Sequence, residues 1–498
     1  MPRDESDIGG LGVMRRGLRI AGLWLAAAFA VFTSIAFASE EAAQASFGAT
    51  VPLMPDEVLD SSARHVPVIL ESLAKRRAAQ GDLLATQGAF DLVFSGDALG
   101  WAGGFYDGRT VGAEARQRFR TFGTEVYGGY SISRGDFPIY QDENFTPRGG
   151  KPKIGVIFSL LRDRDIDPQR FAERDAQIAV AAADLDLLLT RIGVQQQASV
   201  AYWRWVKSGH QMRVYDSLVE IALQRESGLE RQVESGARAS IFLTENRQNI
   251  LRRQRFARAA RREFELAGNE LAFYLRDTEG RPSVPGVERL PPLRDQTVPL
   301  VLESELDLPT ALLERPELRL LRNAVRRADN RIELGQNAMR PRVDLKLEVG
   351  DGLGETGDGG TSRDTTDTIV GLEVSVPMQR RKARGELAAE RAERDALQFA
   401  QRQLSERIEV EVRKILVELE ASLELVNIAA DEVEQAKLMQ NAEVRRFESG
   451  ASDFFLVNLR EEAAADAQVR YLSAELERRV AETEYAAATV DLSALGLE

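Results

Sequence analysis

The sequence predicts a mainly helical chain with a smaller β component, built twice from one unit of helix, strand, strand, helix and helix. Three observations predict this fold class. Segments of the two halves match each other in the same order. Long stretches rich in alanine and charged residues carry apolar side chains at helical spacing. Short alternating segments interrupt these stretches, as expected for strands with one polar face.

The duplication is visible in three pairs of segments. Two proline-led helical stretches, two short apolar strands and two copies of the tetrapeptide ESGA follow one another in equivalent places. The pairs are Pro67 with Pro316, 154–161 (IGVIFSLL) with 370–377 (VGLEVSVP), and 234–237 with 448–451. Because internal repeats fix the architecture of a chain, we expect both halves to follow one plan.

The first residues to set aside form a predicted signal peptide, residues 1–38. A basic stretch precedes an apolar run that ends in Ala36-Phe37-Ala38, so we expect cleavage after Ala38. Met14 is a possible true start. The alternative is an uncleaved membrane anchor, although the apolar run is only marginally long enough to span a bilayer. No other stretch approaches ~18 uninterrupted apolar residues, so we expect no transmembrane helix in the mature chain.

Two repeats and a proline-rich linker, 277–305, make up the rest of the chain. Each repeat has a β region and a helical hairpin whose tip contains Ser-Gly. The first repeat is 57–276, with β segments at about 90–161, a hairpin at about 165–276 and its tip at 235–237; the second is 306–492, with β segments at about 342–377, a hairpin at about 382–492 and its tip at 449–451.

The helix before each tip is the longest element that we expect. It has roughly 65–70 residues and is therefore ~100 Å long at 1.5 Å per residue. Apolar residues along the second one alternate steps of three and four, the pattern of an antiparallel coiled coil. The two shorter helices of each repeat together match the long one, so we expect them to stack end to end beside it. Gly236 and Gly450 supply the positive φ that the turns at the tips need.

The β segments are predicted to lie in a membrane barrel. The region 90–161 is rich in aromatic residues, including Trp101, Tyr127 and Tyr130, and aromatic girdles are typical of outer-membrane barrels. The alternative is a soluble hairpin with an aromatic core. Four strands of one chain cannot close a barrel, and an open sheet edge is not tolerated in lipid. We therefore expect several copies to share one barrel in the lipid of the outer membrane.

Three motifs in order now reveal a family resemblance. They are LLERPELRLLRNAV at 312–325, a strand that ends at Ser375-Val376-Pro377, and FESGASDFFLVNLRE at 447–461. With the duplicated plan, they make the chain resemble the TolC-type outer-membrane efflux proteins over about residues 57–492.

The resemblance implies a homotrimer with a 12-stranded barrel, four strands per chain, above a 12-helix tunnel (an α-barrel) in the periplasm. It also implies a passive exit duct of a tripartite efflux or type I secretion system, with a periplasmic adaptor protein and an inner-membrane pump as partners. The sequence leaves open which of these systems the chain serves and what it exports. The alternative function is a periplasmic coiled-coil scaffold or adaptor without a membrane barrel.

The resemblance places the functional residues at the hairpin tips. The tips would dock the adaptor and form the tunnel entrance, and Pro377 marks the turn from strand to helix. The expected tip residues are Gly236, Ile241, Phe242, Gly450, Asp453, Phe454, Phe455, Leu456 and Leu459. Alternatively, the apolar residues of the second tip pack on Ile241, Phe242 and Leu243 of the first. Asp453 is the nearest acid at the second tip, so an acidic cation-binding ring is not expected.

Composition argues against other functions. The net charge of −13 and the lack of a basic stripe argue against nucleic acid as a partner. With two histidines, no cysteine and no catalytic spacing, we expect neither an enzyme nor a bound cofactor or metal. The aspartates of one glycine-rich loop, Asp351, Asp358, Asp364 and Asp367, fit a solvated loop better than a calcium site because known calcium-loop spacings are not met. The aromatic patch 202–205 (YWRW) is expected to pack between helices or to line the tunnel.

Overall fold

A computed structural model describes residues 51–138, 144–292, 315–355 and 366–497, in two units. The first unit is Met1–Met54 with Pro285–Asp295. It contains the short 3-10 helix η3 (Val287–Arg289), and within it the Leu53 amide donates to the Arg289 carbonyl at 2.8 Å. The expected signal peptide, Asp358 and Asp364 lie outside the described residues. The second unit is Pro55–Val284 with Gln296–Glu498.

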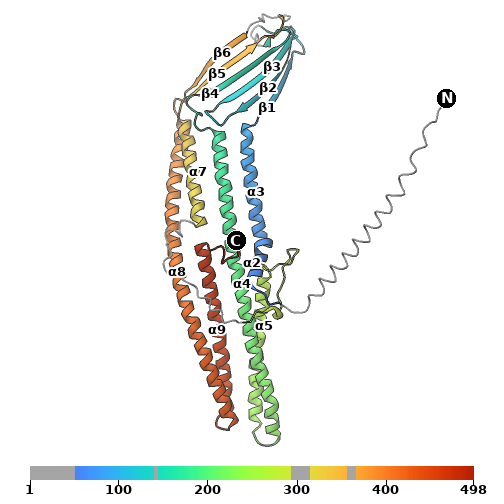
Figure 1. The fold of residues 1–498 in the computed structure, drawn as a ribbon, viewed down its shortest axis with the longest axis vertical. Helices are drawn as coiled ribbons and strands as arrows, with labels where there is room; N and C mark the ends of the chain where they lie inside the picture. The colour runs from blue at the N-terminus through green and yellow to red at the C-terminus, as the bar shows by residue number, and fades with distance from the viewer. Residues whose placement is uncertain (1–50, 139–143, 293–314, 356–365, 498) are drawn as a thin grey trace, which may run out of the picture. The chain divides into compact units, whose positions relative to one another are not determined.

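The second unit contains long helices and one antiparallel sheet (Figure 1). Its helices are α2 (Pro55–His65), α3 (Pro67–Gln87), α4 (Pro168–Glu234), α5 (Ile241–Leu271), α7 (Pro316–Ala338), α8 (Arg381–Glu448) and α9 (Phe454–Thr489), with a 3-10 turn η1 (Gly88–Phe90). Its strands are β1 (Val93–Gly100), β2 (Arg109–Arg118), β3 (Glu125–Arg134), β4 (Lys151–Ser159), β5 (Arg342–Asp351) and β6 (Thr366–Ser375).

The helices have the lengths and neighbours expected from the sequence. The long helices α4 and α8 have 67 and 68 residues, so each is ~100 Å long. Helices α3 and α5 both pack on α4, while α7 and α9 both pack on α8. Figure 1 shows α7 and α9 following one another along α8. The prediction that two shorter helices stack beside each long one is confirmed.

The core along α8 follows the spacing of three and four seen in the sequence. Ile408, Val412, Ile415 and Leu419 are buried on one side of the helix. The first three of them form a cluster with residues of α7 and α9. Next to this cluster the Arg315 guanidinium, from the RPEL motif, donates to the Ala488 carbonyl at 2.7 Å and thereby satisfies a carbonyl at the end of α9.

The aromatic patch on α4 packs against neighbouring helices. Tyr202 and Trp205 are buried, and the ring of Trp205 lies 5.9 Å from that of Phe264 on α5. The Arg479 guanidinium of α9 covers Trp203 at 4.7 Å. Burial raises the pKa of the Tyr202 hydroxyl well above its usual range. Within one chain, packing therefore accounts for the buried rings.

The sheet corrects the expected number of strands. Its six strands are hydrogen-bonded in sequence order, β1 to β6, and every neighbouring pair is antiparallel. Only β5 and β6 come from the second repeat, whereas the first repeat supplies four strands. The expectation of four strands per chain was therefore wrong for this sheet. The reason is an additional hairpin, formed by β1 and β2, within 90–161, a region about twice as long as its counterpart 342–377.

Candidate functional site: the hairpin tips and the two-faced sheet

The two hairpin tips have the same backbone geometry. Gly236 and Gly450 have φ of 74° and 77°, in the left-handed region that L side chains rarely adopt. The next residue, Ala237 or Ala451, donates its amide to a carbonyl five residues back, at 2.9 and 2.8 Å. A Cβ at either glycine would meet nothing within 4 Å. The positive φ, and not lack of space, therefore requires glycine at both tips.

At the second tip, two neighbouring phenylalanines differ strongly in burial. Asp453 is the N-cap of α9 and accepts a hydrogen bond from the Leu456 amide at 2.9 Å. Phe454 is only 1% exposed and packs against Phe447, whereas Phe455 is 62% exposed. Phe454 is therefore not part of an exposed docking surface in this chain.

Phe454 is covered by the first hairpin, as the packing alternative expected, but through another residue. The Arg225 guanidinium of α4 lies 5.5 Å from the centre of its ring. The exposed apolar residues of the tips are Ile241, Phe455 and Leu459. Phe242 and Leu456 are partly buried. A docking surface at the tips stays a prediction, now reduced mainly to the three exposed side chains.

Above the tips, a buried group of charges joins the two hairpins. Glu461 of α9 is 2% exposed and accepts from Arg253 of α5 at 2.8 Å and from Arg225 of α4. Arg253 is 1% exposed and also donates to the Leu218 carbonyl at 3.0 Å. Asn458 accepts from Arg225 at 3.0 Å. The Arg225 side chain is 17% exposed and thus only partly buried. We call Arg225, Arg253 and Glu461 the buried charge triad after its two buried members.

Sequence reasoning missed the buried charge triad, although a signal was present. The buried residues of α5 recur at steps of three and four, and Arg253 occupies one of these positions between Ile250 and Ala257. Glu461 lies on the corresponding buried stripe of α9, after Phe454 and Val457. A charged residue in an apolar stripe predicts a buried partner of opposite charge, since an unpaired charge there costs several kcal/mol.

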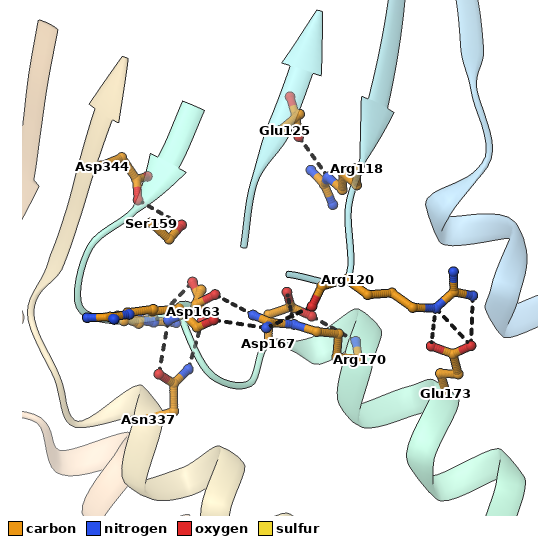
Figure 2. A network of polar contacts seen from close by, with 12 residues as sticks. Arg118, Arg120, Glu125, Ser159, Asp163, Asp167, Arg170, Glu173, Asn337 and Asp344 are labelled. Atoms are coloured by element: carbon orange, nitrogen blue, oxygen red, sulfur yellow. Dashed lines mark hydrogen bonds and ion pairs between the residues drawn. The ribbon is translucent and has the colours of Figure 1, made fainter. Parts of the chain in front are cut away.

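A second polar network joins the sheet to the helices (Figure 2). Arg170, in the first turn of α4, binds Asp167 at 2.9 Å and donates to the carbonyls of Asp163 and Arg120. Asn337 of α7 donates to the Asp163 carboxylate at 2.8 Å and accepts from the Asp163 amide at 2.9 Å. Hydrogen bonds therefore link the residues that precede α4 to the end of α7 and to the turn between β2 and β3.

The same network holds the turn between β2 and β3. Arg120, in the turn between β2 and β3, makes a two-pronged ion pair with Glu173 of α4 at 2.8 and 2.9 Å. Hydrogen bonding to Arg120 lowers the pKa of the Glu173 carboxyl. Gly123 of that turn lies against the backbone of Asp163, where a Cβ would approach the carbonyl oxygen to 2.3 Å. The turn thus directly contacts the first residues of α4 and the segment before them.

The sheet has two faces of different chemistry. The register of the six strands places residues of one parity on each face. Apolar side chains predominate on one face, which we call the apolar face, for example Phe94, Val111, Ile132, Ile154, Leu347 and Val370. Charged side chains predominate on the other, the charged face, for example Asp97, Glu114, Glu125, Lys153, Lys346 and Glu373.

Side chains of the charged face are paired across several strands. Tyr127 of β3 is 3% exposed and lies among Arg116, Lys153 and Lys346, each within 6 Å of its ring. Its hydroxyl binds Glu348. Lys153 of β4 also reaches Glu114 of β2 at 3.0 Å. Paired charges on one face and apolar residues on the other are the pattern of a strand wall between water and lipid.

Comparison with known proteins agrees with this geometry. A family model described as outer membrane efflux protein matches residues 308–494. The chain carries a domain of the outer membrane efflux protein family. The resemblance to TolC-type efflux proteins is thereby confirmed. No curated protein sequence matches the chain significantly.

Solved outer-membrane channels share the fold of this chain over most of its length. VceC from Vibrio cholerae is 14% identical, with a TM-score of 0.60 over 87% of this chain and 95% of VceC. The CmeC channel of Campylobacter jejuni is 14% identical, with a TM-score of 0.59 over 87% and 85% of the two chains. The MtrE channel of Neisseria gonorrhoeae is 16% identical, with a TM-score of 0.59 over 87% and 88%.

The family whose model matches residues 308–494 consists of outer-membrane channels with a helical tunnel in the periplasm. The family is a transport family and not a family of enzymes. No helix within the described part of the chain is both long and apolar enough to cross a membrane. Pro377 lies where expected, in the turn between β6 and α8, and its carbonyl accepts from Arg380 at 3.3 Å.

Proposed function

We propose that this efflux-family protein is an outer-membrane channel that acts as a passive exit duct for substrates delivered by partner proteins. One observation carries the proposal. A sheet with one apolar and one charged face leads directly into helices ~100 Å long. Such helices extend far into the periplasm from a sheet that lies in the membrane. The alternative function, a periplasmic scaffold, gives no reason for an apolar face across the sheet.

The assembly proposed for this channel is a homotrimer. One six-stranded sheet has two open edges, which lipid does not tolerate, so several copies must share one barrel. The helices of the copies would together enclose a periplasmic tunnel. We propose a periplasmic adaptor and, through it, an inner-membrane pump as partners, in either a tripartite efflux or a type I secretion system. The charged face would line the aqueous interior, and the apolar face would contact lipid.

Membrane fractionation tests the proposed location and assembly. We expect the full-length protein to sediment with outer membranes and to migrate as an oligomer before heating and as a monomer of 55.2 kDa or slightly less afterwards. After reconstitution in a planar bilayer, the oligomer should conduct ions through a water-filled pore. A protein found only in the soluble periplasmic fraction would contradict the proposal and support the scaffold alternative.

Export by the whole system tests the docking role of the second tip. Phe455→Asp should weaken adaptor binding about 30-fold, because losing an apolar anchor from an interface costs about 2 kcal/mol. Export should fall in parallel, while the oligomer remains in the outer membrane. The measurements are adaptor affinity for the purified protein and substrate retention in cells that carry the matching adaptor and pump.

Two variants serve as controls for this tip experiment. Phe455→Leu keeps an apolar side chain at the exposed position and should retain export. Phe454→Ala should instead lower the stability of the tip by about 3–5 kcal/mol, because Phe454 is buried within the chain. Normal adaptor binding by Phe455→Asp would show that the exposed phenylalanine does not take part in docking.

A further inference from the structure

The additional hairpin of the first repeat is a continuous part of the sheet. β1 and β2 pair over eight residues, and β2 and β3 over ten, without interruption. β3 then pairs with β4, which itself pairs with β5 of the second repeat. The additional strands β1 and β2 therefore extend the same hydrogen-bonded ladder that contains β5 and β6.

The division into two faces also extends over the additional strands. Phe94 and Val111 share the apolar face with Leu347 and Val370, while Glu114 shares the charged face with Lys346. A hairpin folded into an aqueous interior would not need an apolar face. The ion pair of Arg120 with Glu173 further holds the turn that joins β2 to β3 against the start of α4.

The two free edges of the sheet are complementary in direction. β1 follows α3 and runs away from the helices, whereas β6 runs toward α8. A β6 edge beside the β1 edge of a neighbouring copy would therefore form an antiparallel pair, like every other pair in the sheet. The two strands have 10 and 8 residues, so their lengths allow such a pair.

We propose that β6 of each copy pairs with β1 of the next copy, so that every copy contributes six strands to the shared barrel. This inference rests on the proposed function, because it requires an oligomer in the outer membrane. Three copies of a six-stranded sheet give a barrel of 18 strands. Because barrel diameter grows roughly in proportion to strand number, this barrel is about 1.5 times as wide as one of 12 strands. Its interior is lined by the paired charges of the charged face.

Disulfide cross-linking between copies tests the position of the seam. The chain has no cysteine, so introduced pairs are the only thiols present. Ser95→Cys or Asp97→Cys on β1 is combined with Ile369→Cys or Gly371→Cys on β6, all on the charged face. Two positions on each strand cover the possible registers, because directly opposed residues have Cβ atoms about 4.5–5.5 Å apart. The matched control combines the same β6 cysteines with Gly129→Cys or Ser131→Cys on β3.

We expect oxidation in outer membranes to yield covalent dimers and trimers from at least one β1–β6 combination and only monomers from the β3–β6 combinations. Cross-linking of β3 to β6 would overturn the inference, because it would show a four-stranded wall that excludes β1 and β2. Absence of both cross-links in a membrane-bound oligomer would also overturn it. Fractionation of the same samples separates these outcomes from failure of the proposed function, in which the protein is absent from the outer membrane.

Discussion

Replacing Glu461 by glutamine is expected to lower the free energy of local unfolding around the second hairpin by about 3–5 kcal/mol. The change removes the only carboxylate of the buried charge triad and leaves Arg253, 1% exposed, and Arg225 without a compensating charge. The measurement is hydrogen exchange of the backbone amides of α5 and α9 in the purified full-length protein, which reports local opening free energies.

The neighbouring residue provides a matched control for Glu461. Glu462 also pairs with an arginine, Arg252 of α5, but these side chains are 26% and 47% exposed. Glu462→Gln should therefore change the opening free energy by less than about 1 kcal/mol. Equal effects of the two substitutions would show that burial of the triad does not determine its contribution to the opening free energy.

A second control replaces the whole triad by apolar residues. Arg225→Met, Arg253→Met and Glu461→Leu together remove all three charges and keep similar volumes. Because desolvation of buried charges can cost more than their attraction returns, this triple variant should recover most of the stability lost in Glu461→Gln. Failure to recover would indicate that the hydrogen bonds to Asn458 and to the Leu218 carbonyl contribute more than the charges.

The helical part of the fold could be predicted from the sequence because it depends on local periodicity. Steps of three and four placed Ile408, Val412, Ile415 and Leu419 on one side of a helix, and all four are buried in the structure. The tip glycines could be identified because a helix reversal needs a positive φ, which both residues adopt. Both inferences depend on forces that act within a few residues.

The number of strands and the side-chain directions at the second tip could not be predicted with the same reasoning. Equivalence of the two repeats suggested one hairpin in each, although the first β region is about twice as long as the second. At the tip, two adjacent phenylalanines form one apolar group in the sequence, which does not reveal their different environments. Neighbouring helical residues point about 100° apart, so only Phe454, in line with Val457, faces the interior.

Replacing Leu347 by arginine is expected to prevent assembly of the protein in the outer membrane. Leu347 lies near the middle of β5 on the apolar face, opposite Val156 of β4 and Val370 of β6. An arginine on the lipid side of a barrel costs about 2–4 kcal/mol at the middle of the bilayer, and an assembly of three copies bears this cost three times. The measurement is the fraction of heat-modifiable oligomer recovered from outer membranes.

The adjacent residue shows whether an arginine is tolerated on the other face of the same strand. Lys346 lies on the charged face, where its ammonium group contacts Glu348 at 2.9 Å. Lys346→Arg keeps this pairing in an aqueous interior and should leave the amount of oligomer nearly unchanged. If arginine is equally tolerated at both positions, the apolar face does not contact lipid, and the sheet is not the membrane-spanning part of the protein. If only Leu347→Arg fails, one residue step along β5 separates lipid from water, as strands of a membrane barrel require.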